Sequence, residues 1–180
     1  MRTALIRSLV TATVAATGLL FATATASAST GKENDPVVDA PAGDMTILVT
    51  KLTHAQATSM LRSSGITWSS SGNCSDRNNP TCTSFEQVNL ATIQGAQTLK
   101  TASGCAINIT GGTETGHASG TYSHWNGYKL DMALGSGCLG NYIRSRFTYI
   151  GGNQWKSGSG NIYFLESNHW DVTYFNCGGC

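Results

Sequence analysis

The chain has 180 residues, enough for one well-packed domain, and charged side chains make up only 12% of it. The formal net charge of +1 excludes a strongly basic surface, so neither nucleic acid nor anionic lipid is expected as the main partner. The chain has 21 glycines, 3 prolines and an apolar content of 40%, which predicts many short elements joined by turns around a core.

The first 28 residues have the organisation of a secretory signal peptide. Arg2 and Arg7 give a basic start, residues 9–21 form an apolar stretch of 13 residues, and residues 26–28 (ASA) form a small-residue cleavage site. Thirteen residues are too few for a membrane helix, which needs about 20. We therefore expect a secreted, extracellular product that has no membrane segment once residues 1–28 are removed.

Residues 29–44 are polar, contain two prolines and lack hydrophobic periodicity, which predicts a flexible leader or linker. We expect residues 45–180 to form a single domain, which begins with a short strand at residues 45–50 (MTILVT). Thr53 is then placed to cap a helix whose apolar residues recur at helical spacing until Gly65.

A second helix is predicted by two overlapping capping boxes, T-x-x-E at residues 83–86 and S-x-x-Q at 84–87, before an apolar stripe at 88–99. Further on, strand-like runs alternate with glycine-rich turns, with a short helix near residues 139–148. The runs are residues 106–110, 128–134, 161–165 and 169–175. The order predicts an α+β domain with N-terminal helices packed on a central antiparallel sheet.

Six cysteines in an exported chain indicate a set of disulfides that stabilises the fold. Cys74 and Cys82 are the predicted pair, because the segment between them consists of polar turn residues. Cys177 and Cys180 have the spacing of a redox motif, but no helix follows that would lower a thiolate pKa, which favours a structural role. A cysteine zinc site would need a second C-x-x-C, which the sequence lacks.

Three of the four histidines lie in the second half of the chain, close to carboxylates. His124 precedes an Asn-Gly turn and Asp131 lies on the strand that leaves it, so a hairpin can bring both side chains to one face. Glu166 and His169 flank a break between two strands. Zinc in catalytic sites takes three protein ligands and keeps one position open for water, and His124, Asp131 and His169 can supply those ligands.

Glu166 is then the candidate for a general acid and base, because a carboxylate that does not bind the metal can take a proton from water. Spacing alone leaves a second interpretation open, in which each histidine is an ordinary hydrogen-bonded residue. Tryptophans 125, 155 and 170 and Tyr128 can line a groove or simply pack against the sheet.

The pattern S-H-x-x-G-x-K-x-D at residues 123–131, followed by E-x-x-H at 166–169, resembles the zinc D-alanyl-D-alanine peptidases. The phage L-alanyl-D-glutamate endolysins and the hedgehog signalling domain are relatives of that family. The resemblance covers residues 105–175 and implies an α+β fold with zinc on a central antiparallel sheet. It implies zinc ligands at His124, Asp131 and His169, a general base at Glu166, and a peptidoglycan stem peptide as substrate.

The sequence departs from the family pattern in two places. Lys129 stands where the family has a small residue, and the turn after residue 110 offers Glu114 where the family has an arginine that polarises the scissile carbonyl. His117 could replace that arginine as a hydrogen-bond donor, and Glu114 could bind a substrate ammonium group; the alternative is that both are exposed loop residues. Ser123 is a further candidate for substrate binding. Lys129 and Arg144 are expected to be solvated charges, unless they bind a carbonyl or carboxylate.

Two functions follow from these observations. The first is a monomeric, secreted zinc peptidase that cleaves D-Ala-D-Ala or L-Ala-D-Glu bonds of peptidoglycan. The second is a secreted, zinc-stabilised binding module of the same fold without turnover. The missing arginine favours the binding module, whereas Glu166 favours the enzyme, because a structural zinc site does not need an additional carboxylate.

Overall fold

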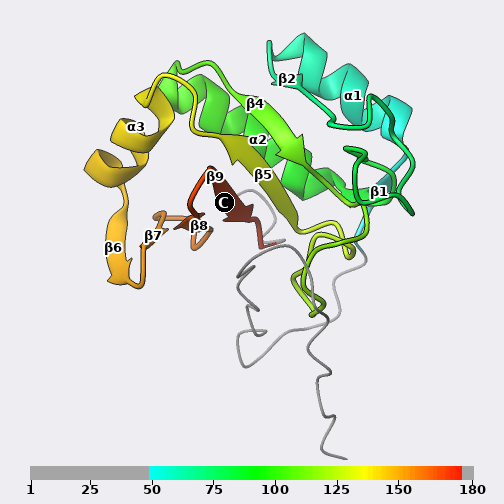
Figure 1. Cartoon of the computed structure of the whole chain (residues 1–180). Helices are drawn as coiled ribbons and strands as arrows, with labels where there is room; N and C mark the ends of the chain where they lie inside the picture. The colour runs from blue at the N-terminus through cyan, green and yellow to red at the C-terminus, as the bar shows by residue number, and fades with distance from the viewer. Residues whose placement is uncertain (1–48, 176–180) are drawn as a thin grey trace, which may run out of the picture.

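The computed structural model describes residues 49–175 (Figure 1). The predicted signal peptide, the predicted leader, most of the predicted strand at 45–50, and Cys177 and Cys180 lie outside these residues. The described part contains three helices, α1 (His54–Ser63), α2 (Leu90–Ser103) and α3 (Cys138–Arg146). None of these helices is long and apolar enough to span a membrane.

Seven strands form one sheet in the order β2-β4-β5-β9-β8-β7-β6, in which only β2 and β4 are parallel. These strands are β2 (Thr67–Trp68), β4 (Asn108–Gly111), β5 (Lys129–Ala133), β6 (Thr148–Gly151), β7 (Gln154–Lys156), β8 (Ile162–Leu165) and β9 (His169–Thr173). A separate antiparallel pair consists of β1 (Lys51–Leu52) and β3 (Val88–Asn89). The predicted α+β class with a mostly antiparallel sheet is confirmed.

Helix α1 begins where the sequence predicts. The Thr53 hydroxyl accepts a hydrogen bond from the Gln56 N–H at 3.3 Å, and the Gln56 side chain accepts one from the Thr53 N–H at 2.9 Å. This reciprocal pair is a capping box, which satisfies two N–H groups that the first helical turn leaves unpaired. The helix ends at Ser63, shortly before Gly65, whose φ of +69° lies in the left-handed region.

The predicted start of the second helix is wrong. Helix α2 begins only after Asn89, and neither predicted capping box forms. The Thr83 hydroxyl donates instead to backbone carbonyls of two neighbouring segments, and the Ser84 N–H donates to the Glu114 carboxylate at 2.9 Å. Tertiary partners have therefore taken the groups that a local cap would need. Of the apolar stripe predicted for the helix, Ile93, Ala96 and Leu99 are buried in α2, whereas Val88 lies in β3.

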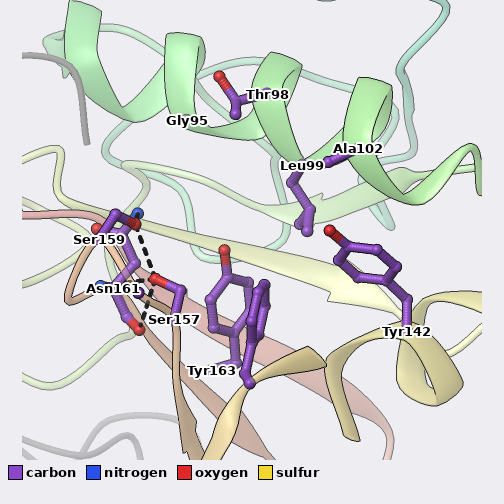
Figure 2. Close-up of a pocket in the computed structure, with 11 residues that line it drawn as sticks. Gly95, Thr98, Leu99, Ala102, Tyr142, Ser157, Ser159, Asn161 and Tyr163 are labelled. Atoms are coloured by element: carbon purple, nitrogen blue, oxygen red, sulfur yellow. Dashed lines mark hydrogen bonds between the residues drawn. The ribbon is translucent and has the colours of Figure 1, made fainter. Parts of the chain in front are cut away.

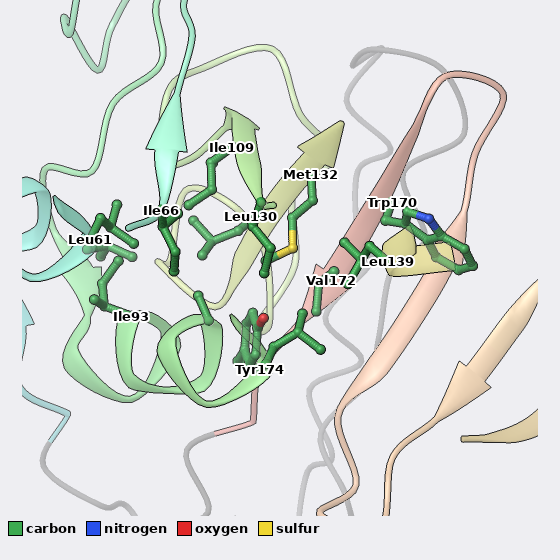
Figure 3. Close-up of a cluster of buried hydrophobic side chains, with 14 of the residues drawn as sticks. Leu61, Ile66, Ile93, Ile109, Leu130, Met132, Leu139, Trp170, Val172 and Tyr174 are labelled. Atoms are coloured by element: carbon green, nitrogen blue, oxygen red, sulfur yellow. The ribbon is translucent and has the colours of Figure 1, made fainter. Parts of the chain in front are cut away.

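The hydrophobic core lies between α2 and one face of the sheet, as Figure 3 shows. Leu130 and Met132 of β5 and Val172 of β9 have no exposed surface and join Ile93 of α2 in one cluster. Successive side chains of a strand point to opposite faces. The residues between these apolar positions, Asp131 among them, therefore point to the face of the sheet opposite to α2.

Two disulfides are present in the described part of the chain, and none of its cysteines is free. The predicted pair, Cys74 with Cys82, is confirmed. Cys105 and Cys138 form the second disulfide, which joins the segment after α2 to the first residue of α3 and is not predictable from spacing.

The helix predicted near residues 139–148 is confirmed as α3, but it ends at Arg146 and is followed by a β6–β7 hairpin that the sequence analysis missed. Three of the four residues of β6 are exposed. A strand without a buried face needs no alternation of apolar and polar residues, and its sequence, TYIG, has none, so no pattern predicts it. The hairpin places β6 at the edge of the sheet.

A cavity of about 180 Å³ lies between α2, α3 and the loop that joins β7 to β8 (Figure 2). Leu99, Tyr142 and Tyr163 contribute to its walls. No residue singled out by the sequence as catalytic, metal-binding or substrate-binding lines this cavity, so it is separate from the candidate site.

Candidate metal centre

Two of the predicted metal ligands lie on the sheet face opposite to α2. Asp131 occupies the middle of β5, directly across from Asp171, and His169 begins β9 directly across from Ala133. Because residues two apart on a strand share a face, Asp131 and His169 are diagonal neighbours. Nε2 of His169 lies 3.3 Å from Oδ1 of Asp131.

His124 reaches the same carboxylate from the turn that precedes β5. Gly127, with a φ of +80°, donates its N–H to the His124 carbonyl oxygen at 2.8 Å and closes this turn. The His124 side chain is completely buried, and its Nε2 lies 3.2 Å from Oδ1 of Asp131. Imidazoles from two separate elements thus approach a single carboxylate oxygen.

His117, in the loop after β4, adds a third imidazole. Its ring stacks on the His124 ring with centroids 3.8 Å apart and planes 16° from parallel. Nδ1 of His117 lies 3.9 Å from Oδ2 of Asp131. His117, His124 and Asp131 each offer one ligand atom, these atoms lie within 4.8 Å of one another, and the group could hold a metal ion.

Glu114 holds this loop from the inside. Its side chain is buried, and its carboxylate accepts hydrogen bonds from the N–H groups of Ser84 at 2.9 Å and Gly112 at 3.0 Å. Oε1 of Glu114 lies 3.2 Å from Nε2 of His117. Burial opposes ionisation, but the hydrogen bonds from His117 and the backbone outweigh it and lower the pKa of Glu114.

The alternative in which Glu114 and His117 are exposed loop residues is therefore wrong, because only 1% of Glu114 and 5% of the His117 side chain are exposed. The contacts found for Glu114 are internal and orient His117. A contact between Glu114 and a substrate ammonium group stays a prediction.

The second nitrogen of each imidazole meets a hydrogen-bond acceptor. Nδ1 of His124 donates to the Gly112 carbonyl oxygen at 2.6 Å, and Nδ1 of His169 donates to the Asn168 side-chain oxygen at 2.6 Å. For His117 the acceptor is the carboxylate described above. In these tautomers the remaining nitrogens carry lone pairs directed at Asp131, which is how metal-binding histidines are usually oriented by their neighbours.

The carboxylate at the centre of the cluster fits a cation. Oδ1 of Asp131 is buried and receives no hydrogen bond of good geometry, although nitrogens of His124 and His169 lie within 3.3 Å of it. A buried oxygen in this situation is costly unless a cation compensates it. The donor set of imidazole nitrogens and a carboxylate suits divalent transition metals.

The protonation states of Asp131 and His117 favour the same conclusion, whereas that of His169 does not. Burial raises the pKa of Asp131, but His124 and the other imidazoles outweigh it and hold that pKa well below its usual range, so the group is ionised. Burial, and then the charge of His124, lowers the pKa of His117 and favours its neutral form. For His169, burial lowers the pKa, but its contact with the charged Asp131 raises it more, so a metal ion would have to displace a proton from this imidazole.

Glu166 lies beside the cluster at the end of β8. Its N–H donates to the His169 carbonyl oxygen at 3.0 Å and closes the turn to β9, and its Oε2 lies 3.4 Å from Nε2 of His169. The carboxylate is thus next to the predicted metal ligands and outside the close group of His117, His124 and Asp131. Its role as a general base stays a prediction.

Ser123 is buried, and its hydroxyl accepts the Asn126 N–H at 3.2 Å. This contact, together with the bond from the Tyr128 N–H to the Ser123 carbonyl oxygen, shapes the turn that presents His124. The structure therefore shows a turn-forming role for Ser123, and a contact with substrate stays a prediction.

The expectation that Lys129 is a solvated charge is wrong. Its Nζ lies 2.7 Å from Oδ2 of Asp171, and each residue is 1% exposed. Lys129 shares a strand face with Asp131, and Asp171 lies across from Asp131 on β9, so alternation brings the ammonium group to this carboxylate. Arg144, by contrast, is exposed, and its guanidinium lies 5.4 Å from the centre of the Trp170 ring.

Arg77 is the residue near the cluster that sequence reasoning missed. It lies in the loop closed by the Cys74–Cys82 disulfide, and its Nε donates to the Thr113 carbonyl oxygen at 3.2 Å. Its guanidinium also donates to the Trp125 carbonyl oxygen and stacks on the Trp125 ring at 3.6 Å. Arg77 thus joins the His117 loop to the His124 turn, and no local pattern in the sequence indicates this long-range contact.

Comparison with known proteins adds no relative. No family model, curated protein or solved structure matches the chain. The functional conclusion therefore rests on the residues and their geometry.

Proposed function

We propose that this protein is a secreted zinc metallopeptidase that hydrolyses peptide bonds of peptidoglycan stem peptides. The observation that carries the proposal is the approach of two imidazoles, from His124 and His169, to one oxygen of Asp131 with the Glu166 carboxylate alongside. The order of these residues supports it through the resemblance to the zinc D-alanyl-D-alanine peptidases, which also supplies the substrate class. The signal peptide predicted at residues 1–28 supports secretion.

We assign the zinc to His124, Asp131 and His169, because catalytic zinc sites have three protein ligands and one open position. In the described residues, His117, His124 and Asp131 form the group whose ligand atoms lie within 4.8 Å of one another, and His169 reaches the same carboxylate at 3.3 Å. The His169 side chain is 21% exposed, whereas the His117 side chain is 5% exposed and is held by Glu114. A substrate can therefore approach from the His169 side of Asp131.

A zinc ion held by these residues would supply a Lewis acid that polarises the scissile carbonyl and lowers the pKa of water. Glu166 would accept a proton from the attacking water on its carboxylate and deliver it to the nitrogen of the leaving amine. Both nitrogens of His117 are directed at protein carboxylates. We therefore propose that His117 orients the Asp131 carboxylate and does not contact the substrate carbonyl, as the sequence had suggested it could.

The proposal is tested by digestion of soluble stem peptides with the zinc-loaded protein, with the product masses read. One peptide ends in D-Ala-D-Ala and a second contains an internal L-Ala-D-Glu bond, so the masses identify the bond that is cut. We expect wild type to cleave one of them and Glu166→Gln to cleave it at least about 10²-fold more slowly, with its zinc retained. Asp76→Asn, which changes an exposed carboxylate in the disulfide loop, is the control and should retain the wild-type rate.

Equal rates for wild type and Glu166→Gln would contradict the proposal. One observation favours the second candidate, the zinc-stabilised binding module: the turn after β4 carries the buried carboxylate of Glu114 where the resembling peptidases carry an arginine. A wild-type protein that holds zinc and cleaves neither peptide would establish that candidate instead.

A further inference from the structure

The edge of the sheet farthest from α1 carries exposed aromatic and basic side chains. Tyr149 is 59% exposed and Ile150 is 49% exposed, and they are two of the three large hydrophobic residues exposed in the described part of the chain. Tyr149 and Trp155 lie directly across from each other on β6 and β7 and so share a face of the sheet, and Arg144 of α3 approaches the Trp155 ring. We call these three residues, together with Arg146 at the end of α3, the edge surface. Large exposed hydrophobic groups that cluster with charged ones are typical of interaction sites.

The rings of the edge surface are ordered by contacts with one another. The centroid of Tyr149 lies 5.0 Å from that of Trp155, which in turn lies 5.4 Å from that of the buried Trp170. The Arg144 guanidinium lies 5.7 Å from the centre of the Trp155 ring. Because the core holds one end of this series, a ligand that stacks on Tyr149 and Trp155 meets side chains whose freedom is already restricted.

The charge of this region selects the partner. Residues 132–165 contain three basic residues and no acidic one, and the nearest acidic residues along the chain are Asp131 and Glu166 of the metal centre. A second copy of the chain pairing through β6 would bring these positive charges together, which is unfavourable. The tip of the β6–β7 hairpin has the sequence GGNQ, which offers no apolar side chain for insertion into a membrane.

We propose that the edge surface binds peptidoglycan outside the metal centre, with sugar rings stacked on Tyr149 and Trp155 and stem-peptide carboxylates paired with the basic residues. The apolar C–H face of a sugar ring fits an aromatic face, and an anionic chain fits the positive charge. The identity of the polymer rests on the proposed function.

The test is co-sedimentation of the mature protein with purified, insoluble peptidoglycan, in the Glu166→Gln background so that the polymer is not digested. We expect Tyr149→Ala combined with Arg144→Gln and Arg146→Gln to weaken binding about tenfold or more, because a stacking platform and two charges are lost. Binding of the parent should fall as salt is raised. Arg62→Gln, which removes an exposed basic residue of α1, should bind like the parent.

A triple variant that binds peptidoglycan as tightly as its parent would overturn the inference. Capture by anionic phospholipid vesicles that the triple variant loses, with no binding to peptidoglycan, would assign the surface to a membrane. Self-association that the triple variant loses, with no binding to peptidoglycan, would assign it to a second copy of the chain.

The same three substitutions in the active protein separate this inference from the proposed function. Cleavage of the short soluble peptides should stay within about twofold of wild type, whereas release of fragments from the intact polymer should fall about as much as binding. A protein that cleaves soluble peptides but does not bind through this surface would refute only the inference. A protein that binds through it and cleaves nothing would refute only the proposed function.

Discussion

Gly111, the last residue of β4, allows the Asp131 carboxylate to occupy its position. A Cβ added at residue 111 would meet Oδ2 of Asp131 and lie only 2.8 Å from its Cγ, where ordinary contacts are 3.4–4 Å. We therefore predict that Gly111→Ala displaces the carboxylate without changing any metal ligand. Overpacking of this kind costs about 1–3 kcal/mol of stability. Displacement of an oriented ligand should weaken metal binding by at least about 10–100-fold.

The assay is a competition titration of zinc against a chromophoric chelator, with the thermal midpoint measured on the same samples. Gly158→Ala is the matched control, because a Cβ there meets nothing within 4 Å and the residue has no left-handed φ. It should leave zinc affinity unchanged. A Gly111→Ala protein that is folded and binds zinc as tightly as wild type would refute the placement of Asp131 in the metal site.

Three further predictions concern stability. Replacing Cys105 and Cys138 by alanine should lower the free energy of unfolding by about 4 kcal/mol, because the disulfide spans 33 residues. The free energy is measured by chemical denaturation, and an unchanged midpoint would contradict the prediction. Lys129→Met should lower the free energy of unfolding by about 3–5 kcal/mol, because the buried Asp171 carboxylate loses its ammonium partner. Lys129→Met combined with Asp171→Leu should recover most of this loss, and a double variant without recovery would argue against the ion pair. Because the pKa of Glu114 is lowered in the folded protein, its ionised carboxylate contributes to the free energy of unfolding. This contribution is complete above the unfolded pKa near 4.5 and is lost as the pH falls through the folded pKa, so the difference in thermal midpoint between metal-free wild type and Glu114→Gln should narrow below pH 4.5. A difference that stays constant would contradict this prediction.

The parts of the site that could be predicted from sequence are those set by local pattern. Alternation of apolar and polar residues placed Asp131 on one face of β5 and His169 on one face of β9, and the Asn-Gly turn placed His124 before β5. A helical period and a threonine cap predicted α1 in the same way. In these segments the local preference and the tertiary structure agree.

The parts that could not be predicted depend on contacts between segments far apart in sequence. His117 contacts Glu114, which is itself held by the Ser84 N–H, and no spacing rule indicates that bond. The same bond holds Ser84, which resembled a helix cap, and the Thr83 hydroxyl is bound by carbonyls of two other segments, so long-range contacts explain the wrong start of α2. For Lys129 the sequence predicts a solvated charge, because a lone lysine is usually exposed, whereas here Asp171 compensates its burial.

The central claim is that His124, Asp131 and His169 hold a zinc ion for catalysis. Equilibrium titration of the metal-stripped protein with zinc, read by mass spectrometry of the native protein, tests it most directly. We predict about one zinc per chain for wild type and loss of that zinc in both Asp131→Ala and His169→Ala, because three ligands leave little affinity to spare. Equal zinc content in wild type and the two variants, all of them folded, would contradict the assignment.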